Sequence, residues 1–153
     1  MTLLATKITS ALVEAVQGAT IAAGYPSNVG RLVFRGQLRG GAIQAPCTFV
    51  LPGTSRDSAY YNGCREITRQ VEIHGFADAN AYPDLTDDAL VDQIIWDLRQ
   101  VLEADNTLGG LAQDLRYVAD RPGYREDGGS IVGAGLTYEV VTHINIADAS
   151  API

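Results

Sequence analysis

Two cysteines and two histidines are the side chains of this sequence that could act as nucleophiles, general bases or soft-metal ligands. A cysteine hydrolase would need Cys47 or Cys64 beside His74 or His143 and an aspartate, because the histidine converts the thiol into the reactive thiolate. No local motif fixes such a pairing, and the four residues lack the CxxC and HxxxH spacings of a zinc site. The sequence therefore predicts no catalytic residue, no metal site and no cofactor. It also predicts no disulfide, because nothing else in it suggests an oxidising compartment.

Carboxylates and glycines are more frequent, but their spacings match no catalytic or binding motif. Asp84, Asp87 and Asp88 could hold a hard cation, yet they lack the alternating ligand spacing of an EF-hand loop. Their position at an expected helix start is explained by the helix dipole, which favours carboxylates there. The four glycines between residues 128 and 135 match neither GxGxxG nor a phosphate loop. Within a strand, they indicate bulges or a close approach of another backbone.

The composition indicates one folded domain that spans residues 1–153. A hydrophobic fraction of 46% argues against disorder, and we expect a core over residues 7–146 with a frayed tail at residues 147–153. No apolar run approaches the roughly 18–20 residues that a membrane span needs, and the N-terminus lacks the basic segment of a signal peptide. With a net charge of −7, the chain is a poor sequence-independent DNA binder, because phosphate affinity comes from clustered Lys and Arg.

The pattern of apolar residues predicts an α+β fold with a mixed, mainly antiparallel sheet backed by two amphipathic helices. The first helix is expected at residues 7–23, where apolar residues recur at helical spacing and Gly24 and Pro26 end the run. Its alanine-rich stripe suits core packing against the sheet, with a tight contact between subunits as the alternative. Strands are expected where apolar and polar residues alternate, at residues 31–38, 45–51, 64–76, 111–119 and 131–146.

Two long polar segments, at residues 52–63 and 120–130, are expected to be irregular loops. Long loops are often functional, and both segments contain the arginines and tyrosines that are common in protein interfaces. For the first loop, a solvated segment whose tyrosines pack back onto the sheet is an equal alternative. The candidate contact residues in these loops are Arg56, Tyr60, Tyr61, Arg121, Tyr124 and Arg125.

The second helix concentrates the negative charge of the chain. Seven of the eighteen carboxylates lie between residues 84 and 105, with Arg99 as the single cation among them, so this span carries −6 of the formal −7. Trp96 falls on the polar side of the helix, beside Asp92, Arg99 and Glu103. Either a loop covers this tryptophan or it contacts a neighbouring subunit. The adjacent arginine favours a subunit contact through Trp96 and Arg99.

This helix is followed by the turn ADNTLGGL at residues 104–111 and by strand-like segments at residues 115–117 and 137–141. Together with the N-terminal amphipathic helix, the central sheet and its long polar loop, this arrangement resembles the tail terminator and tail completion proteins of long-tailed bacteriophages. These are ring-forming minor tail proteins of the lambda type. The resemblance covers about residues 7–146.

The resemblance implies a structural virion protein, not an enzyme, that is assembled in the host cytoplasm. Such proteins form rings, typically homohexamers, on the head-proximal end of the tail tube. There they end tube polymerisation and offer the surface on which the head docks. The implied partners are further copies of the chain, the tail-tube protein and the neck or connector protein of the head–tail junction. DNA passes through the ring without specific binding, and no membrane is involved.

A ring of this kind predicts a particular place for the acidic helix. If the helix lined the channel, Asp92 and Glu103 would face the passing DNA and repel its phosphates. Two alternative functions stay open beside the terminator. The nearer one is a head–tail connector or a tail-tube subunit. The more distant one is a small acidic cysteine-dependent hydrolase that uses Cys64 and His74.

Overall fold

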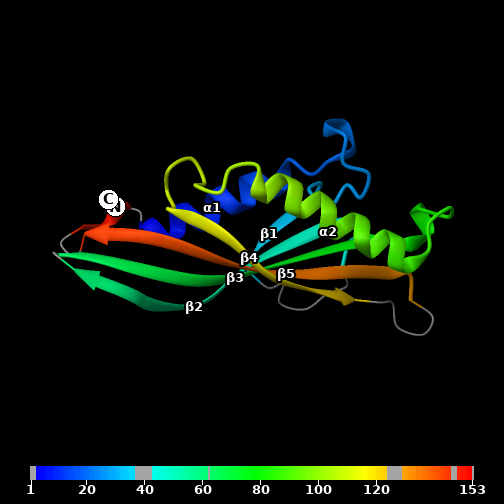
Figure 1. Cartoon of the computed structure of the whole chain (residues 1–153). Coiled ribbons are helices and arrows are strands. Elements are labelled where there is room, and N and C mark those ends of the chain that lie inside the picture. Colours follow the sequence, from blue (N-terminus) through cyan, green and yellow to red (C-terminus); the bar gives the residue numbers. More distant parts are fainter. Residues whose placement is uncertain (1–2, 37–42, 62, 124–128, 146–147, 153) are drawn as a thin grey trace.

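The computed structural model of the chain describes residues 3–36, 43–61, 63–123, 129–145 and 148–152 (Figure 1). Two α-helices, α1 (Leu4–Gln17) and α2 (Asp87–Glu103), and two short 3-10 turns, η1 (Ile21–Ala23) and η2 (Ala79–Ala81), accompany the strands. The strands are β1 (Val33–Arg35), β2 (Cys47–Tyr61), β3 (Cys64–Asp78), β4 (Asp114–Gly123), β5 (Ile131–Asn145) and β6 (Asp148–Pro152). The predicted α+β class is confirmed.

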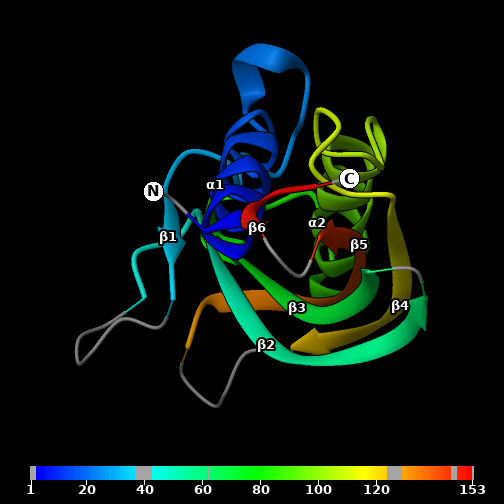
Figure 2. The same cartoon turned by 90° about the vertical axis from the view of Figure 1, so that its left-hand side faces the viewer.

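The strands form one curved sheet in the order β1-β2-β3-β5-β4, with β6 paired to the end of β5. The β1–β2 pair is parallel and every other pair is antiparallel. The sheet is therefore mixed and mainly antiparallel, as the sequence predicted. Both α-helices lie on the same face of the sheet, inside its curve (Figure 2). The sheet therefore has one face covered by helices and one open face, which matches the alternation of apolar and polar residues along β3 and β5.

The core lies between the helices and the inner face of the sheet. Along α1, buried residues recur every fourth position, at Leu4, Ile8, Leu12 and Val16, so one stripe of the helix faces the sheet. The helix α2 approaches the sheet closely at Gly75. A Cβ atom there would lie 2.9 Å from side-chain atoms of two α2 residues, Ile94 and Leu98. Glycine at this position is what allows the helix to pack so near the strand.

The first helix ends earlier than the sequence predicted. It stops at Gln17, and Gly18 closes it with a backbone bond to Ala15, because glycine is a poor helix former. Residues 21–23 form the separate turn η1. The alanine stripe is mostly core: Ala19 is buried, and Ala11 and Ala15 pack against the buried cluster. This favours core packing over a contact between subunits for that part of the stripe.

Most of the first segment expected to be a loop is strand, and so is the start of the second. Residues 52–61 continue β2 and pair with β3 through two register shifts, and β4 runs on to Gly123, which pairs with Gly133. We call residues 52–61 the β2 arm. The alternation of apolar and polar residues did not predict it as a strand, because from Gly53 to Asp57 its described side chains are exposed on both faces. The tail was expected to fray, whereas Asp148–Pro152 forms β6 and pairs with β5.

Candidate interaction surface

The tryptophan of α2 lies on the solvent side of the helix, as its position in the helical pattern predicted. The buried residues of α2 face the sheet, and Trp96 is 59% exposed. It forms one wall of an open hollow that is also lined by Tyr25, Arg99, Gln100, Glu103 and Ala104. The described part of the chain therefore leaves most of the Trp96 indole uncovered. Whether a neighbouring subunit covers it stays a prediction.

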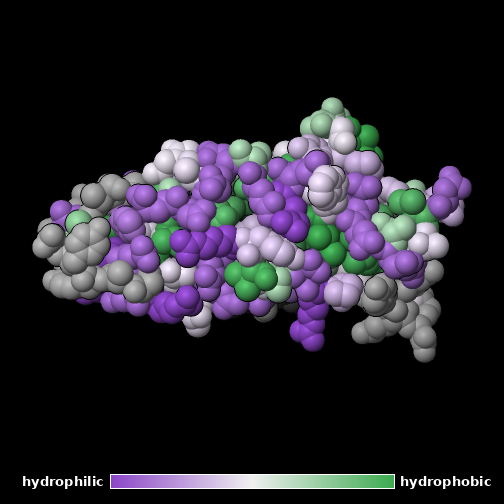
Figure 3. Space-filling view, viewed as in Figure 1, coloured by the Kyte–Doolittle hydropathy of each residue, from purple (hydrophilic) through white to green (hydrophobic). Residues whose placement is uncertain are grey.

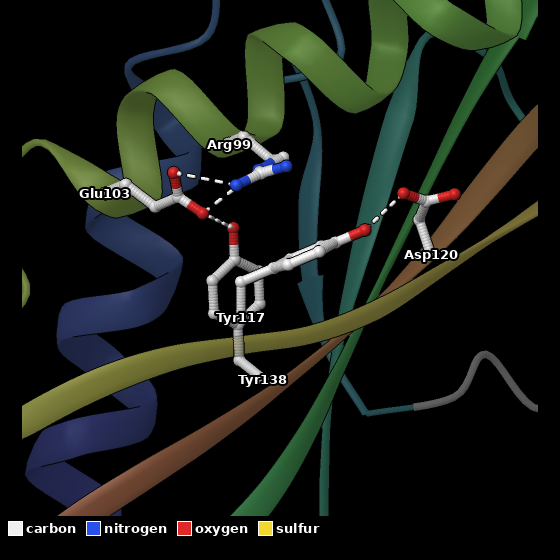
Figure 4. A network of polar contacts seen from close by, with 5 residues as sticks. All are labelled: Arg99, Glu103, Tyr117, Asp120 and Tyr138. Atoms are coloured by element: carbon white, nitrogen blue, oxygen red, sulfur yellow. Dashed lines mark hydrogen bonds and ion pairs between the residues drawn. The ribbon is translucent and has the colours of Figure 1, made fainter.

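Beside Trp96, Arg99 and Glu103 belong to a polar network that joins α2 to the sheet (Figure 4). Arg99 Nε donates to Glu103 Oε1 at 3.0 Å, and the guanidinium carbon lies 3.9 Å from the centroid of the Tyr117 ring. The hydroxyl of Tyr138 donates to Glu103 Oε1 at 3.2 Å, and the hydroxyl of Tyr117 donates to Asp120. Arg99 and Glu103 thus have structural roles that the sequence did not reveal.

The network makes stability sensitive to alkaline pH. Burial, and then Glu103, raise the pKa of Tyr138 far above the ordinary 10.0, and burial raises the pKa of Tyr117 in the same direction. A raised folded-state pKa means that the neutral phenols stabilise the fold fully below pH 10, and that this contribution is lost as the pH rises further. We therefore expect the free energy of unfolding to fall above pH 10, and to fall less steeply in Tyr138→Phe. At pH 7 the variant loses about 1 kcal/mol with its hydrogen bond.

Urea denaturation between pH 7 and pH 11 measures this slope. The buried Cys47 thiol, whose pKa burial raises from 9.0 to about 11, adds a loss of its own over that interval. Tyr138→Phe is therefore best compared with wild type in a Cys47→Ala background. Equal slopes in the two proteins would contradict the assignment to Tyr138.

Another carboxylate of α2, Asp97, is buried at 1% exposure. Its Oδ2 accepts the backbone N–H of Ser27 at 2.9 Å and the Ser27 hydroxyl at 2.5 Å. Its Oδ1 accepts the Gln93 side-chain amide at 2.7 Å. Asp97 therefore ties the segment between α1 and β1 to α2, and it is not part of an acidic surface.

The acidic surface of α2 is consequently smaller than the sequence suggested. Asp92 is exposed and remains a candidate for the channel wall. Glu103 is bound to Arg99 and Tyr138, so its charge is partly balanced within the chain. In the described ranges, no group of three His, Cys, Asp or Glu side chains could hold a metal ion. No described helix is both long and apolar enough to cross a membrane.

The remaining candidate contact residues lie apart from the Trp96 hollow. Arg56, on β2, reaches Glu139 at 3.3 Å across the open face of the sheet. Arg121, on β4, lines a second hollow on that face with Glu72 and His74. Tyr60 and Tyr61 lie in β2, but their side chains are outside the described part of the structure, as are all atoms of Tyr124 and Arg125.

The cysteines and histidines are arranged poorly for the hydrolase alternative. Cys64 and His74 lie ten residues apart on β3, which separates them by about 33 Å. Cys47 is fully buried, and burial raises its pKa to about 11, which opposes formation of a thiolate. Cys64 does lie two register positions from His143, whose Nε2 is 2.8 Å from Glu66 Oε2.

The turn after α2 is built by its own side chains. Asp105 accepts the Thr107 backbone N–H at 3.0 Å, the Thr107 hydroxyl at 2.6 Å and the Gly109 backbone N–H at 2.8 Å. The Thr107 bond, then those from the backbone, lowers the pKa of Asp105. Leu108, at a φ of 50°, is buried, and Gly109 and Gly110 also have positive φ values, of 69° and 86°. The ADNTLGGL segment is therefore a defined turn, which anchors one side chain in the core and leads into β4.

No protein-family model matches the chain, and no curated protein matches it. Among solved structures, a chain from the "Virion of native gene transfer agent (GTA) particle" aligns with a TM-score of 0.48 at 12% sequence identity. The alignment covers 89% of this chain and 94% of that one. At this TM-score and identity, the likeness carries no conclusion about function.

Proposed function

We propose that this chain is a structural virion protein that forms a closed ring on the head-proximal end of a bacteriophage tail tube. The ring ends polymerisation of the tube and provides the surface on which the head docks. It is a homohexamer whose partners are the tail-tube protein and the neck or connector protein. DNA passes through the ring without specific binding.

The observation that carries this proposal is the turn at residues 104–111. It is part of the sequence resemblance to the terminator group, and the contacts of Asp105 show it to be a formed element of the fold. It also connects the acidic helix to the sheet in the order that the resemblance implies. The exposed Trp96 adds an apolar surface beside it of the kind that self-association buries.

The edges of the sheet favour association through side chains over association by strand addition. On one edge, β2 carries Pro52 and two register shifts beyond the short β1, and on the other, β4 carries a register shift and Pro122. Proline and bulges are devices that block pairing with a strand of another chain. A ring of this protein is therefore held by surfaces such as the Trp96 hollow.

The mass of the purified protein in solution tests the proposal. Native mass spectrometry and light scattering over a range of concentrations should find discrete closed oligomers near six copies, or a monomer that closes into such a ring on added tube ends. Open-ended polymers would instead indicate a tube subunit. A monomer or dimer that forms no ring under either condition would refute the terminator function.

The Trp96 contact has its own prediction. Trp96→Ala should leave the fold intact, because most of the indole side chain is exposed in the monomer. It should weaken assembly of the oligomeric ring by tenfold or more, since a tryptophan buried at an interface contributes about 2 kcal/mol or more. Val118→Ala, an exposed apolar residue on β4 outside this hollow, is the matched control. Rings of unchanged stability in Trp96→Ala would place the subunit contact elsewhere.

The channel position of α2 is tested by a structure of the assembled ring. We expect Asp92 on the inner wall, where its carboxylate repels DNA phosphates. Asp92 on the outer wall of the ring would refute this placement without affecting the terminator function.

A further inference from the structure

The segment between α1 and β1 projects from the helical layer and exposes uncharged surface (Figure 1). Residues 15–30 contain no Asp, Glu, Lys, Arg or His, in a chain with 19% charged residues. At its outer end Ile21 is 61% exposed, and Ala22 and Ala23 are exposed beside it. Apolar residues gather over this projection in the space-filling view (Figure 3). We call residues 21–24 the tip.

The tip is held rigidly although it projects. Gly24 N–H bonds the Ile21 carbonyl at 2.9 Å, and Ile21 N–H bonds Asn28 Oδ1 at 3.1 Å. Its base is fixed by the contacts of Ser27 with Asp97 and by the Tyr82 hydroxyl, which donates to the Pro26 carbonyl at 2.8 Å. A surface that is already ordered loses little conformational entropy on binding. The tip is therefore suited to insertion into a partner.

An apolar groove lies at the other end of α1. It has a volume of about 220 Å³ and runs between the start of the helix and the inner face of the sheet. Its lining includes Leu3, Ile8, Ile67, Val140 and Ile144, of which Leu3 is 57% exposed. Three polar residues also line it, Ser55, Arg69 and Thr142, of which Arg69 is the only one with a charge. The groove thus offers mainly apolar walls and no negative charge.

We propose that the tip of one copy of this chain inserts into the α1 groove of a second copy. The side chain of Ile21 then enters the apolar groove and packs against its walls. This contact would be the one that joins neighbouring subunits of the proposed ring. That the assembly closes rests on the proposed function. The contact also places Trp96 under the same neighbour, since Tyr25, at the base of the tip, lines the Trp96 hollow.

The arrangement of the two surfaces makes the contact head-to-tail. The fourteen residues of α1 separate tip and groove by about 21 Å along the helix. Two different patches at opposite ends form a heterologous contact, which closes into a ring or continues as a filament. We assign the occupant as a second copy of this chain because neither surface carries a negative charge. The tip has no charged residue, and the only charged residue that lines the groove is an arginine. Copies with a net charge of −7 can approach there with least repulsion.

Two exposed positions test the contact without disturbing the core. Ile21→Asp places a charge on the tip and does not change the groove. Leu3→Asp places a charge in the groove and does not change the tip. Each variant alone should lose self-association by about tenfold or more. An equimolar mixture should form a 1:1 complex and nothing larger, because only one productive tip–groove pair remains. Val118→Asp, at 52% exposure on β4, is the matched control and should associate as the wild type does.

If self-association is too weak to measure, a disulfide cross-link between the tip and the groove can still test the contact. In a Cys64→Ser background, Ile21→Cys in one copy and Leu3→Cys in another should form a disulfide on mild oxidation. The native Cys47 is buried and does not compete.

Rings that survive both aspartate variants would overturn the contact and leave the terminator function standing. A cross-link without any ring would support the contact and refute the ring. Neither ring nor cross-link would overturn both.

Discussion

Asp97→Ala is expected to lower the free energy of unfolding by about 4 kcal/mol. The substitution removes the acceptor of three hydrogen bonds at a site with 1% exposure. The Ser27 backbone N–H loses its charged partner, and a buried donor without an acceptor costs about 1–3 kcal/mol by itself. Urea denaturation at neutral pH measures the loss. The tip should also lose its fixed position, so ring formation should weaken in proportion.

Matched variants separate the carboxylate from the loss of side-chain volume. Asp92→Ala, an exposed position on the same helix, should change the free energy of unfolding by less than about 0.5 kcal/mol. Asp97→Asn should be milder than Asp97→Ala, because its carbonyl oxygen can still accept from Ser27. A loss below about 1 kcal/mol in Asp97→Ala would show that the carboxylate does not hold the tip segment.

The buried position of Asp97 can be predicted from helical spacing, although a count of carboxylates alone assigns it to the acidic surface. Asp97 lies seven residues after Leu90, so the two side chains point within about 20° of each other on the helix. It therefore falls in the apolar arc of α2, where a carboxylate must find partners. Its partner Ser27 lies seventy residues away in the chain, and no local pattern could identify it.

Elements with one buried face were easier to predict than the exposed part of β2. The apolar stripes of α1 and α2 and the alternation in β3 and β5 follow from burial on one face. The sequence therefore predicted these four elements, although α1 begins and ends earlier than expected. The β2 arm is different, because it is held by backbone pairing with β3, and its exposed side chains leave no periodic signal. The Arg99–Tyr117–Tyr138 network likewise depends on the packing of α2 over β4 and β5, which sequence spacing does not contain.

Gly30→Ala is expected to lower the free energy of unfolding by about 3 kcal/mol, because the position has no room for a side chain. A Cβ atom there would lie 2.4 Å from the Val16 carbonyl oxygen and 2.8 Å from the Ala19 nitrogen. These are backbone atoms, which cannot move aside as a flexible side chain can. To relieve this clash, the backbone at Gly30 must move away from the backbone at Ala19. That movement breaks the 2.8 Å hydrogen bond from the Gly30 N–H to the Ala19 carbonyl, which closes the base of the tip segment.

Gly18→Ala provides the control for this prediction, since Gly18 has a helical φ of −71° and its nearest neighbour for a new Cβ is the Ala15 carbonyl oxygen at 3.1 Å. We expect a change of less than about 1 kcal/mol there. The comparison also bears on assembly. If the tip inserts into a second copy, Gly30→Ala should abolish rings at concentrations where most of the protein is still folded, because the tip is displaced before the core is lost. Rings that persist in folded Gly30→Ala would show that the orientation of the tip does not matter for association.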